Sequence, residues 1–422
     1  MERVSPRMKA CIVAIGTEIL TGETLDTNSN FLALQLAELQ IPLHSIQTVR
    51  DTAPAIEEAL QRAFSVADLV ITTGGLGPTV DDITRKTLAG YFGQELILDQ
   101  VVLSKIEAMF KVRGKDMLPM HRQQAMVPEG AEVLENNHGS APGIWLERDG
   151  KALCSLPGVP SEVRGIMLDE VRPRIKERFL SENIAVKRLM FAGIRESHIA
   201  HKIEHIEQNL PEHIDIAYLP NYGVVKVRLT ATGPDQRALE QEIDALSAQI
   251  REAAGDYLYS EKGQSLPEHI GERFSRHGLT VGTAESCTGG YVGHLITSVA
   301  GSSAYFMGAL VTYQNHLKER MLSVQAETLA LHGAVSEATV REMATGAREQ
   351  LGVDYAVSVS GVAGPGGGSE GKPVGTVWMA AASSKNIIAQ KFGFTPQRDR
   401  NIKLSGIMAL DMLRRLLRKD GF

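Results

Sequence analysis

Short apolar segments that stop at a glycine turn and continue into a helical pattern recur along this chain. Residues 8–15 are expected to form a buried strand ending at Gly16, and residues 68–73 another ending at Gly74. Strands that alternate with helices at this spacing predict a doubly wound, mostly parallel sheet. Such sheets bind ligands beyond the carboxyl ends of their strands, which directs attention to the glycine turns.

At 422 residues the chain is long enough for two or three domains, each with its own core. We place the doubly wound α/β domain at residues 1–175 and a smaller α+β module at residues 176–260. The module should contain strand, helix, two strands, helix and strand, in that order. Residues 261–422 are predicted to form a second α/β domain, with long helices near residues 336–351 and 399–418.

The composition is ordinary for a soluble globular protein, with 43% hydrophobic and 22% charged residues. A formal net charge of −6 and a pI near 6.1 argue against direct nucleic-acid binding, which normally needs a basic surface. Three scattered cysteines fit neither a disulfide framework nor a zinc knuckle. No signal-peptide pattern and no membrane-spanning apolar run are present, so we expect a cytoplasmic protein without membrane contact.

Hydroxyls, glycines and one lysine are concentrated in several stretches of the C-terminal domain. In order, these are Glu285-Ser-Cys-Thr-Gly-Gly290, Gly301-Ser-Ser-Ala-Tyr-Phe306, Thr312-Tyr313 with Asn315 and Lys318, Gly333-Ala-Val-Ser-Glu337, and Ser360-Gly-Val-Ala-Gly-Pro-Gly-Gly367. They resemble the nicotinamide mononucleotide (NMN) deamidases of the PncC type. These deamidases form the C-terminal part of the CinA (competence/damage-inducible protein A) family, and the likeness covers residues 266–415.

The resemblance implies an amidohydrolase that converts NMN to nicotinate mononucleotide and ammonia without a metal. In the family a serine of the Gly-Ser-Ser turn is thought to act as nucleophile and a nearby lysine as base. These map onto Ser303 and Lys318, with Tyr313 close by and Ser302 as the alternative nucleophile. The implied NMN-binding residues are Ser286, Thr288, Gly289, Gly290, Ser302, Asn315, Ser360, Gly361, Gly364 and Arg398, the last for the phosphate.

The proposed chemistry places a demand on the lysine. Releasing ammonia from a carboxamide is an acyl transfer, which needs an activated hydroxyl and donors for the oxyanion. Lys318 can serve as the base only if burial or a neighbouring cation lowers its pKa, because an ammonium group cannot accept a proton. Cys287 is the rival nucleophile, although an isolated cysteine beside a strand more often fills space in the core.

A second glycine-rich turn, Thr72-Thr-Gly-Gly-Leu-Gly-Pro-Thr-Val-Asp-Asp82, follows the strand at residues 68–73. Its glycines would let phosphate oxygens approach the backbone. Asp81 and Asp82 would repel a bare phosphate, so we expect a divalent cation between them and the ligand. The structural alternative is that Thr79 or Asp81 only caps the next helix.

This first domain resembles the molybdenum-cofactor-binding fold and, more closely, the N-terminal domain of the CinA family. The motifs are Gly16-Thr-Glu-Ile-Leu-Thr-Gly22, Asp26-Thr-Asn28, the turn at residues 74–79, Asn137, Ala141-Pro-Gly143 and Leu156-Pro-Gly-Val-Pro-Ser-Glu162. Family members are reported as metal-dependent ADP-ribose pyrophosphatases that give AMP and ribose 5-phosphate.

Carried over to this chain, the likeness implies a Mg²⁺, Mn²⁺ or Co²⁺ ion at Asp81 and Asp82, and a homodimer. The implied ADP-ribose residues are Glu18, Asp26, Asn28, Gly74, Gly75, Gly77, Thr79, Asn137, Gly158 and Pro160. The middle module resembles the KH-like insert of the family but lacks the Gly-X-X-Gly loop that clamps RNA. Two alternatives stay open: a molybdopterin- or nucleotide-binding module without turnover, and an interaction protein serving competence or DNA recombination.

Overall fold

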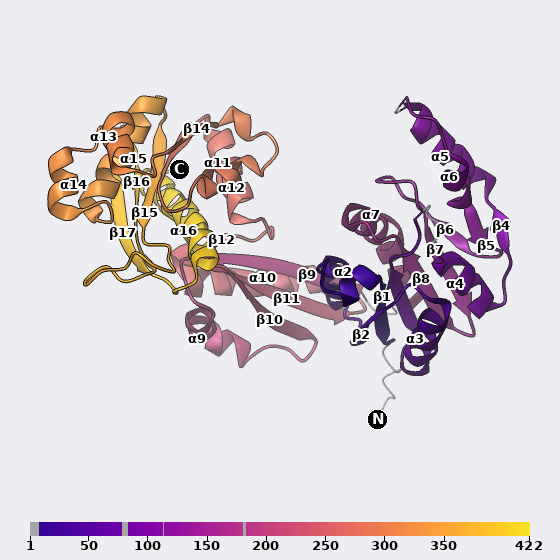
Figure 1. Cartoon of the computed structure of the whole chain (residues 1–422). Helices are drawn as coiled ribbons and strands as arrows, with labels where there is room; N and C mark the ends of the chain where they lie inside the picture. The colour runs from indigo at the N-terminus through magenta and orange to yellow at the C-terminus, as the bar shows by residue number, and fades with distance from the viewer. Residues whose placement is uncertain (1–7, 78–82, 113, 180–182) are drawn as a thin grey trace. The chain divides into compact units, whose positions relative to one another are not determined.

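The computed structural model describes residues 8–77, 83–112, 114–179 and 183–422. Thr79, Asp81 and Asp82 therefore lie outside the described residues. The chain divides into two compact units, Met1–Ile184 and Ala185–Phe422. The first unit is the N-terminal domain, and the second contains both the middle module and the C-terminal domain (Figure 1).

The N-terminal domain contains a mixed sheet with strand order β2-β1-β3-β8-β7-β6. The bounds are β1 Ala10–Ile15, β2 Leu43–Val49, β3 Leu69–Thr73, β6 Glu132–Leu134, β7 Gly143–Arg148 and β8 Lys151–Leu156, with a separate pair β4 Leu96–Leu98 and β5 Met126–Pro128. The first four strands in the order run parallel, which confirms the prediction. Strand β7 is antiparallel to β8 because Asp149 and Gly150 both adopt positive φ, 54° and 75°, the conformation of a tight hairpin turn.

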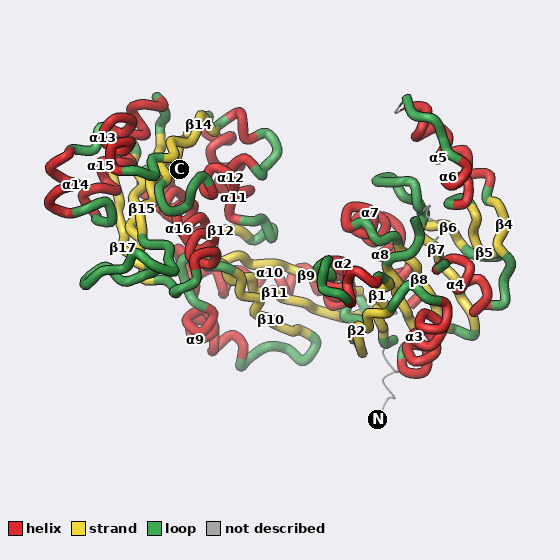
Figure 2. The backbone as a smooth tube through the Cα atoms, in the orientation of Figure 1, coloured by secondary structure: helices red, strands yellow, loops and turns green. Residues whose placement is uncertain are grey.

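Helices cover both faces of this sheet, as expected for a doubly wound domain. Their bounds are α1 Thr17–Leu20, α2 Thr27–Glu38, α3 Ala53–Val66, α4 Thr84–Phe92, α5 Gln100–Val112, α6 Pro119–Gln123, α7 Pro160–Ile166, a π-helical turn Met167–Val171 and α8 Arg172–Phe179. One buried cluster joins α2, α7 and α8 to the sheet, and another joins α3 and α4 to the opposite face. Figure 2 shows this alternation of strands and helices along the backbone.

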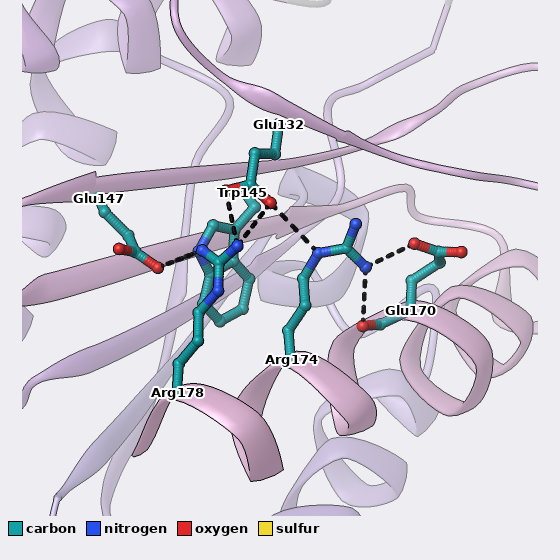
Figure 3. Close-up of polar contacts among 6 residues, drawn as sticks. All are labelled: Glu132, Trp145, Glu147, Glu170, Arg174 and Arg178. Carbon is teal, nitrogen blue, oxygen red and sulfur yellow. Dashed lines mark hydrogen bonds and ion pairs between the residues drawn. The ribbon is translucent and has the colours of Figure 1, made fainter.

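Charged side chains fix α8 to the antiparallel part of the sheet (Figure 3). Arg178 contacts Glu132 of β6 at 2.8 Å and Glu147 of β7 at 2.7 Å. Arg174, one turn earlier, contacts Glu132 at 3.4 Å and Glu170 at 2.5 Å. Because several partly buried charges share partners in one network, these contacts hold the helix more firmly than an isolated surface pair would.

The middle module has the predicted order of elements. Its bounds are β9 Asn183–Ala192, α9 Glu196–Glu207, β10 Ile214–Asn221, β11 Val224–Gly233, α10 Gln236–Ala254, a 3₁₀ turn Gly255–Tyr257 and β12 Leu258–Ser260. The sheet order is β10-β11-β9-β12, and both helices pack on one face. Along β9, Leu189 and Phe191 face those helices, whereas Met190 and Ala192 belong to the core of the C-terminal domain.

The C-terminal domain is a three-layer sandwich around a sheet with order β14-β13-β15-β16-β17. Its strands are β13 Val281–Glu285, β14 Phe306–Val311, β15 Tyr355–Gly361, β16 Thr376–Ala382 and β17 Ile387–Gly393. Its helices are α11 Leu266–His277, α12 Tyr291–Thr297, a 3₁₀ turn Ser302–Ala304, α13 Asn315–Leu322, α14 Ala326–His332, α15 Glu337–Leu351 and α16 Arg398–Lys419.

The two helical layers of this domain differ in their elements. Helices α11, α12 and α16 share the main core on one face, whereas α15 packs on the other face with α13 and α14 beside it (Figure 1). Strands β14, β13 and β15 are parallel, so their carboxyl ends lie at one edge of the sheet. Across the described residues, no helix is long and apolar enough to cross a bilayer.

Candidate functional site

The carboxyl ends of β13 and β14 bring a serine and a lysine together. Ser286 directly follows β13, and Thr312 and Tyr313 directly follow β14. Helix α13 begins at Asn315, and Lys318 lies in its first turn. A long helical side chain points back toward the helix N-terminus, so the Lys318 amine reaches the end of β14.

Lys318 is buried, with only 1% of its surface exposed. Its Nζ lies 3.3 Å from Ser286 Oγ, 2.8 Å from the carbonyl oxygen of Thr312 and 3.3 Å from that of Tyr313. Among the residues that the structure describes, none places a carboxylate in an ion pair with this amine. Burial lowers the pKa of Lys318 from its ordinary value of 10.5.

These three contacts match the valences of a neutral amine. An uncharged –NH₂ group has two hydrogens and one lone pair. Two hydrogens can go to the two carbonyl oxygens, which leaves the lone pair facing the Ser286 hydroxyl. In this neutral state the Ser286 hydroxyl would donate a hydrogen bond to Lys318 Nζ, the arrangement that a serine nucleophile and its base require, whereas a protonated Lys318 donates to Ser286 Oγ instead.

Ser303, the predicted nucleophile, lies at the other end of β14. It belongs to the exposed 3₁₀ turn Ser302–Ala304, which precedes the strand, whereas Lys318 follows the strand. The strand has six residues, and a strand of that length spans roughly 17–20 Å. The structure therefore does not bring Ser302 or Ser303 to Lys318, and the serine that it places beside the amine is Ser286.

Cys287 is buried, with 7% of its surface exposed. Burial raises the pKa of its thiol to about 12. A thiol rather than a thiolate is a weak nucleophile at neutral pH, so the structure favours the space-filling role.

The turn after Ser286 is shaped by Glu285, whose carboxylate is fully buried. It accepts hydrogen bonds from the backbone N–H groups of Gly290 and Val292 at 3.0 Å and of Gly293 at 2.8 Å. These amides at the start of α12 are therefore occupied. In the described structure the backbone N–H groups of Cys287 and Thr288 donate to no other residue.

A second group of predicted residues meets at the start of α16. Arg398 Nη1 donates to the carbonyl oxygen of Gly364 at 3.0 Å, and its Nη2 lies 3.1 Å from Tyr313 Oη. Buried Asn401 ties the same loop down through the carbonyl oxygen of Ala363 at 2.9 Å. Tyr313 thus connects the arginine to the serine and lysine, because its own carbonyl oxygen contacts Lys318.

The other predicted NMN residues surround the same edge of the sheet. Ser360 is the penultimate residue of β15 and donates to the carbonyl oxygen of Ala334 at 2.7 Å, and Gly361 ends the strand. The hydroxyl groups of Thr288 and Thr312 are buried without a partner among the described residues, so they can receive a ligand or a water. Asn315 is exposed at the start of α13, and Gly289 and Gly290 form the turn before α12.

The N-terminal domain has a cavity of about 340 Å³ at the carboxyl ends of its parallel strands. Most of the residues predicted for ADP-ribose line it: Glu18, Asp26, Asn28, Gly74, Gly75, Gly158 and Pro160. Asn137 instead lines a separate cavity of about 760 Å³ beside α5, and Gly77 lines neither. The structure thus assembles the predicted set only in part.

Several of these residues also have structural roles. Asn28 Nδ2 donates to the carbonyl oxygen of Gly158 at 2.7 Å and to Thr73 Oγ1 at 3.1 Å. These bonds connect the carboxyl ends of β3 and β8. Asp26 caps α2 by accepting from the backbone N–H of Ser29 at 2.8 Å. At Gly74 an added Cβ would meet the carbonyl oxygen of Ile15 at 2.0 Å, so glycine is required there whether or not a phosphate binds.

The described residues contain no cluster of side chains that would hold a metal ion by themselves. Within them, no group of three or more His, Cys, Asp or Glu side chains could hold an ion. Of the carboxylates lining the 340 Å³ cavity, Asp26 caps a helix and Asp51 accepts from the backbone N–H of Thr17 at 2.9 Å. The divalent cation stays a prediction that rests on Asp81 and Asp82.

Family models match all three parts of the chain. They are the CinA C-terminal domain at residues 263–417, the "Probable molybdopterin binding domain" at residues 11–177 and the damage-inducible protein CinA KH domain at residues 186–260. A CinA-like protein of Cytophaga hutchinsonii is 41% identical over 97% of this chain and 98% of its own length. This chain belongs to the CinA family.

Two further proteins are similar to this chain. A CinA-like protein of Chloroherpeton thalassium is 41% identical over 97% of this chain and 99% of its own length. The crystal structure of competence/damage inducible protein CihA from Agrobacterium tumefaciens is 42% identical and covers 36% of this chain and 93% of its own, with a TM-score of 0.35.

Sequence reasoning placed Ser286 of this CinA chain only among the substrate contacts. The signal that could have found its pairing with Lys318 was already available. Ser286 follows the short segment that begins at Val281, and Lys318 follows the apolar segment at residues 306–311, which Ser303 precedes. In a parallel sheet only residues after strands share the binding edge. The capping role of Glu285 had no such signal, because it depends on the path of the turn after Ser286.

Proposed function

We propose that the C-terminal domain hydrolyses the carboxamide of nicotinamide mononucleotide to give nicotinate mononucleotide and ammonia. The supporting observation is the contact between Ser286 Oγ and the buried Lys318 amine, whose pKa burial lowers, at the binding edge of the sheet. Family membership points to the same activity, and the site offers an exposed arginine near the serine for a phosphate.

In this proposal Ser286 attacks the carboxamide carbon while its proton passes to Lys318. The oxyanion is met by the free N–H groups of Cys287 and Thr288. Lys318 then gives the proton to the leaving nitrogen, so the C–N bond breaks, ammonia departs and an ester to Ser286 remains. Water attacks that ester, its proton again passing to Lys318, and the proton finally returns to the Ser286 oxygen as the acid is released.

The substrate phosphate fits the start of α16. Arg398 is exposed, and the first turn of this long helix presents free backbone N–H groups that favour an anion. Guanidinium groups bind phosphate through paired hydrogen bonds. A substrate held there can extend past Tyr313 and place its ring amide at Ser286, because Tyr313 contacts both Arg398 and Lys318.

The deciding experiment measures ammonia release from nicotinamide mononucleotide by the purified chain alone. Ser286→Ala and Lys318→Arg should each lower kcat by at least about 1,000-fold, because the nucleophile and its base act as a unit. Ser303→Ala is the matched control and should stay within about twofold of the parent, the change expected where a side chain takes no part in the transition state. Full activity in Ser286→Ala with loss in Ser303→Ala would reverse the assignment. Activity without any partner protein would make an interaction role secondary.

We further propose that the N-terminal domain hydrolyses ADP-ribose to AMP and ribose 5-phosphate with a divalent cation. The supporting observation is the cavity at the carboxyl ends of β1, β3 and β8, which gathers most of the predicted residues. The residues of this chain would orient the ligand. Asn28 would do so from the carboxyl end of β3, and Gly74 and Gly158 would let the ligand approach their backbone closely. The cation would supply charge neutralisation at the diphosphate.

AMP release from ADP-ribose tests this second activity. It should require added Mg²⁺, Mn²⁺ or Co²⁺ and fall at least about tenfold in Asp81→Ala, Asp82→Ala and Asn28→Ala. Asn209→Ala, at an exposed asparagine of the middle module, is the control and should change nothing. Binding of ADP-ribose without AMP release would instead support the non-hydrolytic nucleotide-binding module.

A further inference from the structure

A cavity of about 350 Å³ lies within the second compact unit, where the middle module meets the C-terminal domain. Strands β10 and β11 and the turn between them form one wall. Tyr291 of α12, Lys403 and Ile407 of α16 and the start of α11 form the other. No residue predicted for NMN or ADP-ribose lines this cavity, so it is distinct from both proposed active sites.

The walls of this seam cavity are held by packing that needs no ligand. Met190 and Ala192 of β9 are part of the core of the C-terminal domain. The turn at Gly223 approaches α16 so closely that an added Cβ would lie 2.9 Å from Met408 Cε. Arg414 of α16 donates to the carbonyl oxygen of Asp256 in the module at 2.7 Å. A preformed cavity at a domain junction is a common place for small ligands.

The lining has a distinct chemistry. Three tyrosine rings, Tyr222, Tyr259 and Tyr291, are set among aliphatic side chains. Two lysines, Lys226 and Lys403, also line the cavity, and none of its described lining residues carries a carboxylate. Aromatic faces favour a planar ring, and ammonium groups favour an anion. The combination suits a planar aromatic group that carries a negative charge.

Lys403 can leave its present partners to bind the anionic group of such a ligand, and Tyr222 lies beside it. The Lys403 ammonium lies 5.4 Å from the centroid of the Tyr222 ring and 2.7 Å from Asp399 Oδ2. The Asp399 side chain is 78% exposed, so water screens this pair and it holds Lys403 only weakly. Tyr222 and Gly223 have positive φ, 28° and 79°, as expected for the two-residue hairpin between β10 and β11, which presents Tyr222 to the cavity.

Two elements that line the cavity, α12 and α16, also carry or adjoin residues of the proposed deamidase site. Tyr291 directly follows the Gly289–Gly290 turn that leads back to Ser286. Lys403 and Arg398 lie on the first turns of α16. A ligand that fixes Tyr291 and Lys403 therefore acts on both elements that position the nucleophile and the phosphate-binding arginine.

We propose that this seam cavity binds a mononucleotide, meaning a planar heteroaromatic ring joined to a phosphate, as a ligand separate from either substrate. The tyrosines take the ring and the lysines take the phosphate. Occupancy then changes the rate at Ser286 through α12 and α16. The binding claim stands without the proposed deamidase activity, and only its effect on rate depends on that activity.

The test uses the full chain with Asn28→Ala and Arg398→Ala, which weaken nucleotide binding at the two other sites. Adenosine 5′-monophosphate is titrated into this protein by calorimetry, and one saturable site per chain is expected. Adding Lys403→Ala or Tyr222→Leu should raise its Kd at least about tenfold, the loss expected for a charge-assisted contact or a stacked ring. Adenosine and ribose 5-phosphate, which each lack one half of the ligand, should bind at least tenfold more weakly by the same reasoning.

Lys385→Ala is the matched control, because Lys385 also places its ammonium near an aromatic ring, 5.9 Å from the centroid of Phe422, away from the cavity. It should leave the Kd unchanged. Absence of saturable binding, or equal Kd values in Lys403→Ala and Lys385→Ala, would overturn the proposal. In the parent chain, the nucleotide should shift kcat or KM for ammonia release, and Lys403→Ala should abolish that shift. A shift that persists in Lys403→Ala would contradict the coupling.

Discussion

At the scale of single residues, the state of the Lys318 amine controls the proposed chemistry. Burial without an anionic partner holds its pKa below the ordinary value of 10.5. The neutral form is the base, and that form is lost as the pH falls through the pKa of the folded protein. Deamidation should therefore fail on the acidic side of this pKa and reach a plateau on the alkaline side.

A pH profile of kcat/KM measures this dependence directly, since it reports ionisations of the free enzyme. We expect a rise of about tenfold per pH unit up to a midpoint below 10.5, followed by a plateau. Lys318→Arg should be inactive at every pH because a guanidinium stays protonated. A flat profile in the parent chain would contradict the role of Lys318 as base.

In the turn after β3, the close approach of the backbone to Ile15 makes stability depend on glycine at position 74. Gly74 has φ of 109°, and a Cβ there would lie 2.0 Å from the carbonyl oxygen of Ile15. Gly74→Ala should lower the free energy of unfolding by about 1–3 kcal/mol or more through strain and displacement of β1. Urea unfolding followed by circular dichroism measures the change.

Gly90 of α4 is the matched control for that substitution, because a Cβ added there meets nothing within 4 Å. Gly90→Ala should be neutral or stabilising by up to about 1 kcal/mol, as expected for alanine in a helix. Equal effects of the two substitutions would mean that the close approach at Gly74 is not needed for folding.

At the scale of elements, the proposed phosphate site lies at the start of α16. Arg398→Ala should raise KM for nicotinamide mononucleotide by about 10–100-fold, the loss expected for a charge-assisted hydrogen bond, with a smaller effect on kcat. Nicotinamide riboside lacks the phosphate, so its kinetics should not change. Arg415→Ala, on the same helix and bonded to Gln390 Oε1 at 2.7 Å, is the control and should behave as the parent.

The order of elements could be predicted because it depends on local patterns. The helix near residues 336–351 has Ser336 as its cap, and the module has the expected strands and helices. The partner of Lys318 was missed because it depends on which strand ends share an edge, and Ser303 carried a stronger family signal. The hairpin that reverses β7 and the seam cavity depend on long-range packing, which no local pattern in this sequence indicates.

At the scale of the whole molecule, a buried ion pair within α16 supports the arginine that contacts the middle module. Asp411 and Arg414 of α16 are 2.6 Å apart, with side chains only 4% and 9% exposed, and Arg414 also reaches the module at Asp256. Removing one member of a buried pair leaves an uncompensated charge. Arg414→Ala should therefore destabilise this unit by about 3–5 kcal/mol.

Arg418 provides the matched comparison, since it pairs with the same Asp256 from an exposed position. Arg418→Ala should cost no more than about 1 kcal/mol, as is usual for a surface pair. Denaturant unfolding of the full-length variants gives both values. If both arginines cost the same, the buried pair does not hold the module to the C-terminal domain.

Tyr313 touches the guanidinium at one end and, through its backbone, the amine at the other. The fold therefore fixes the separation between the proposed phosphate-binding arginine and the proposed base. A mononucleotide can bridge these two groups, whereas the phosphate of a dinucleotide continues into a second nucleoside that extends beyond the arginine. Ammonia release should therefore be slower from NAD than from nicotinamide mononucleotide, and equal rates on the two would contradict this selection by length.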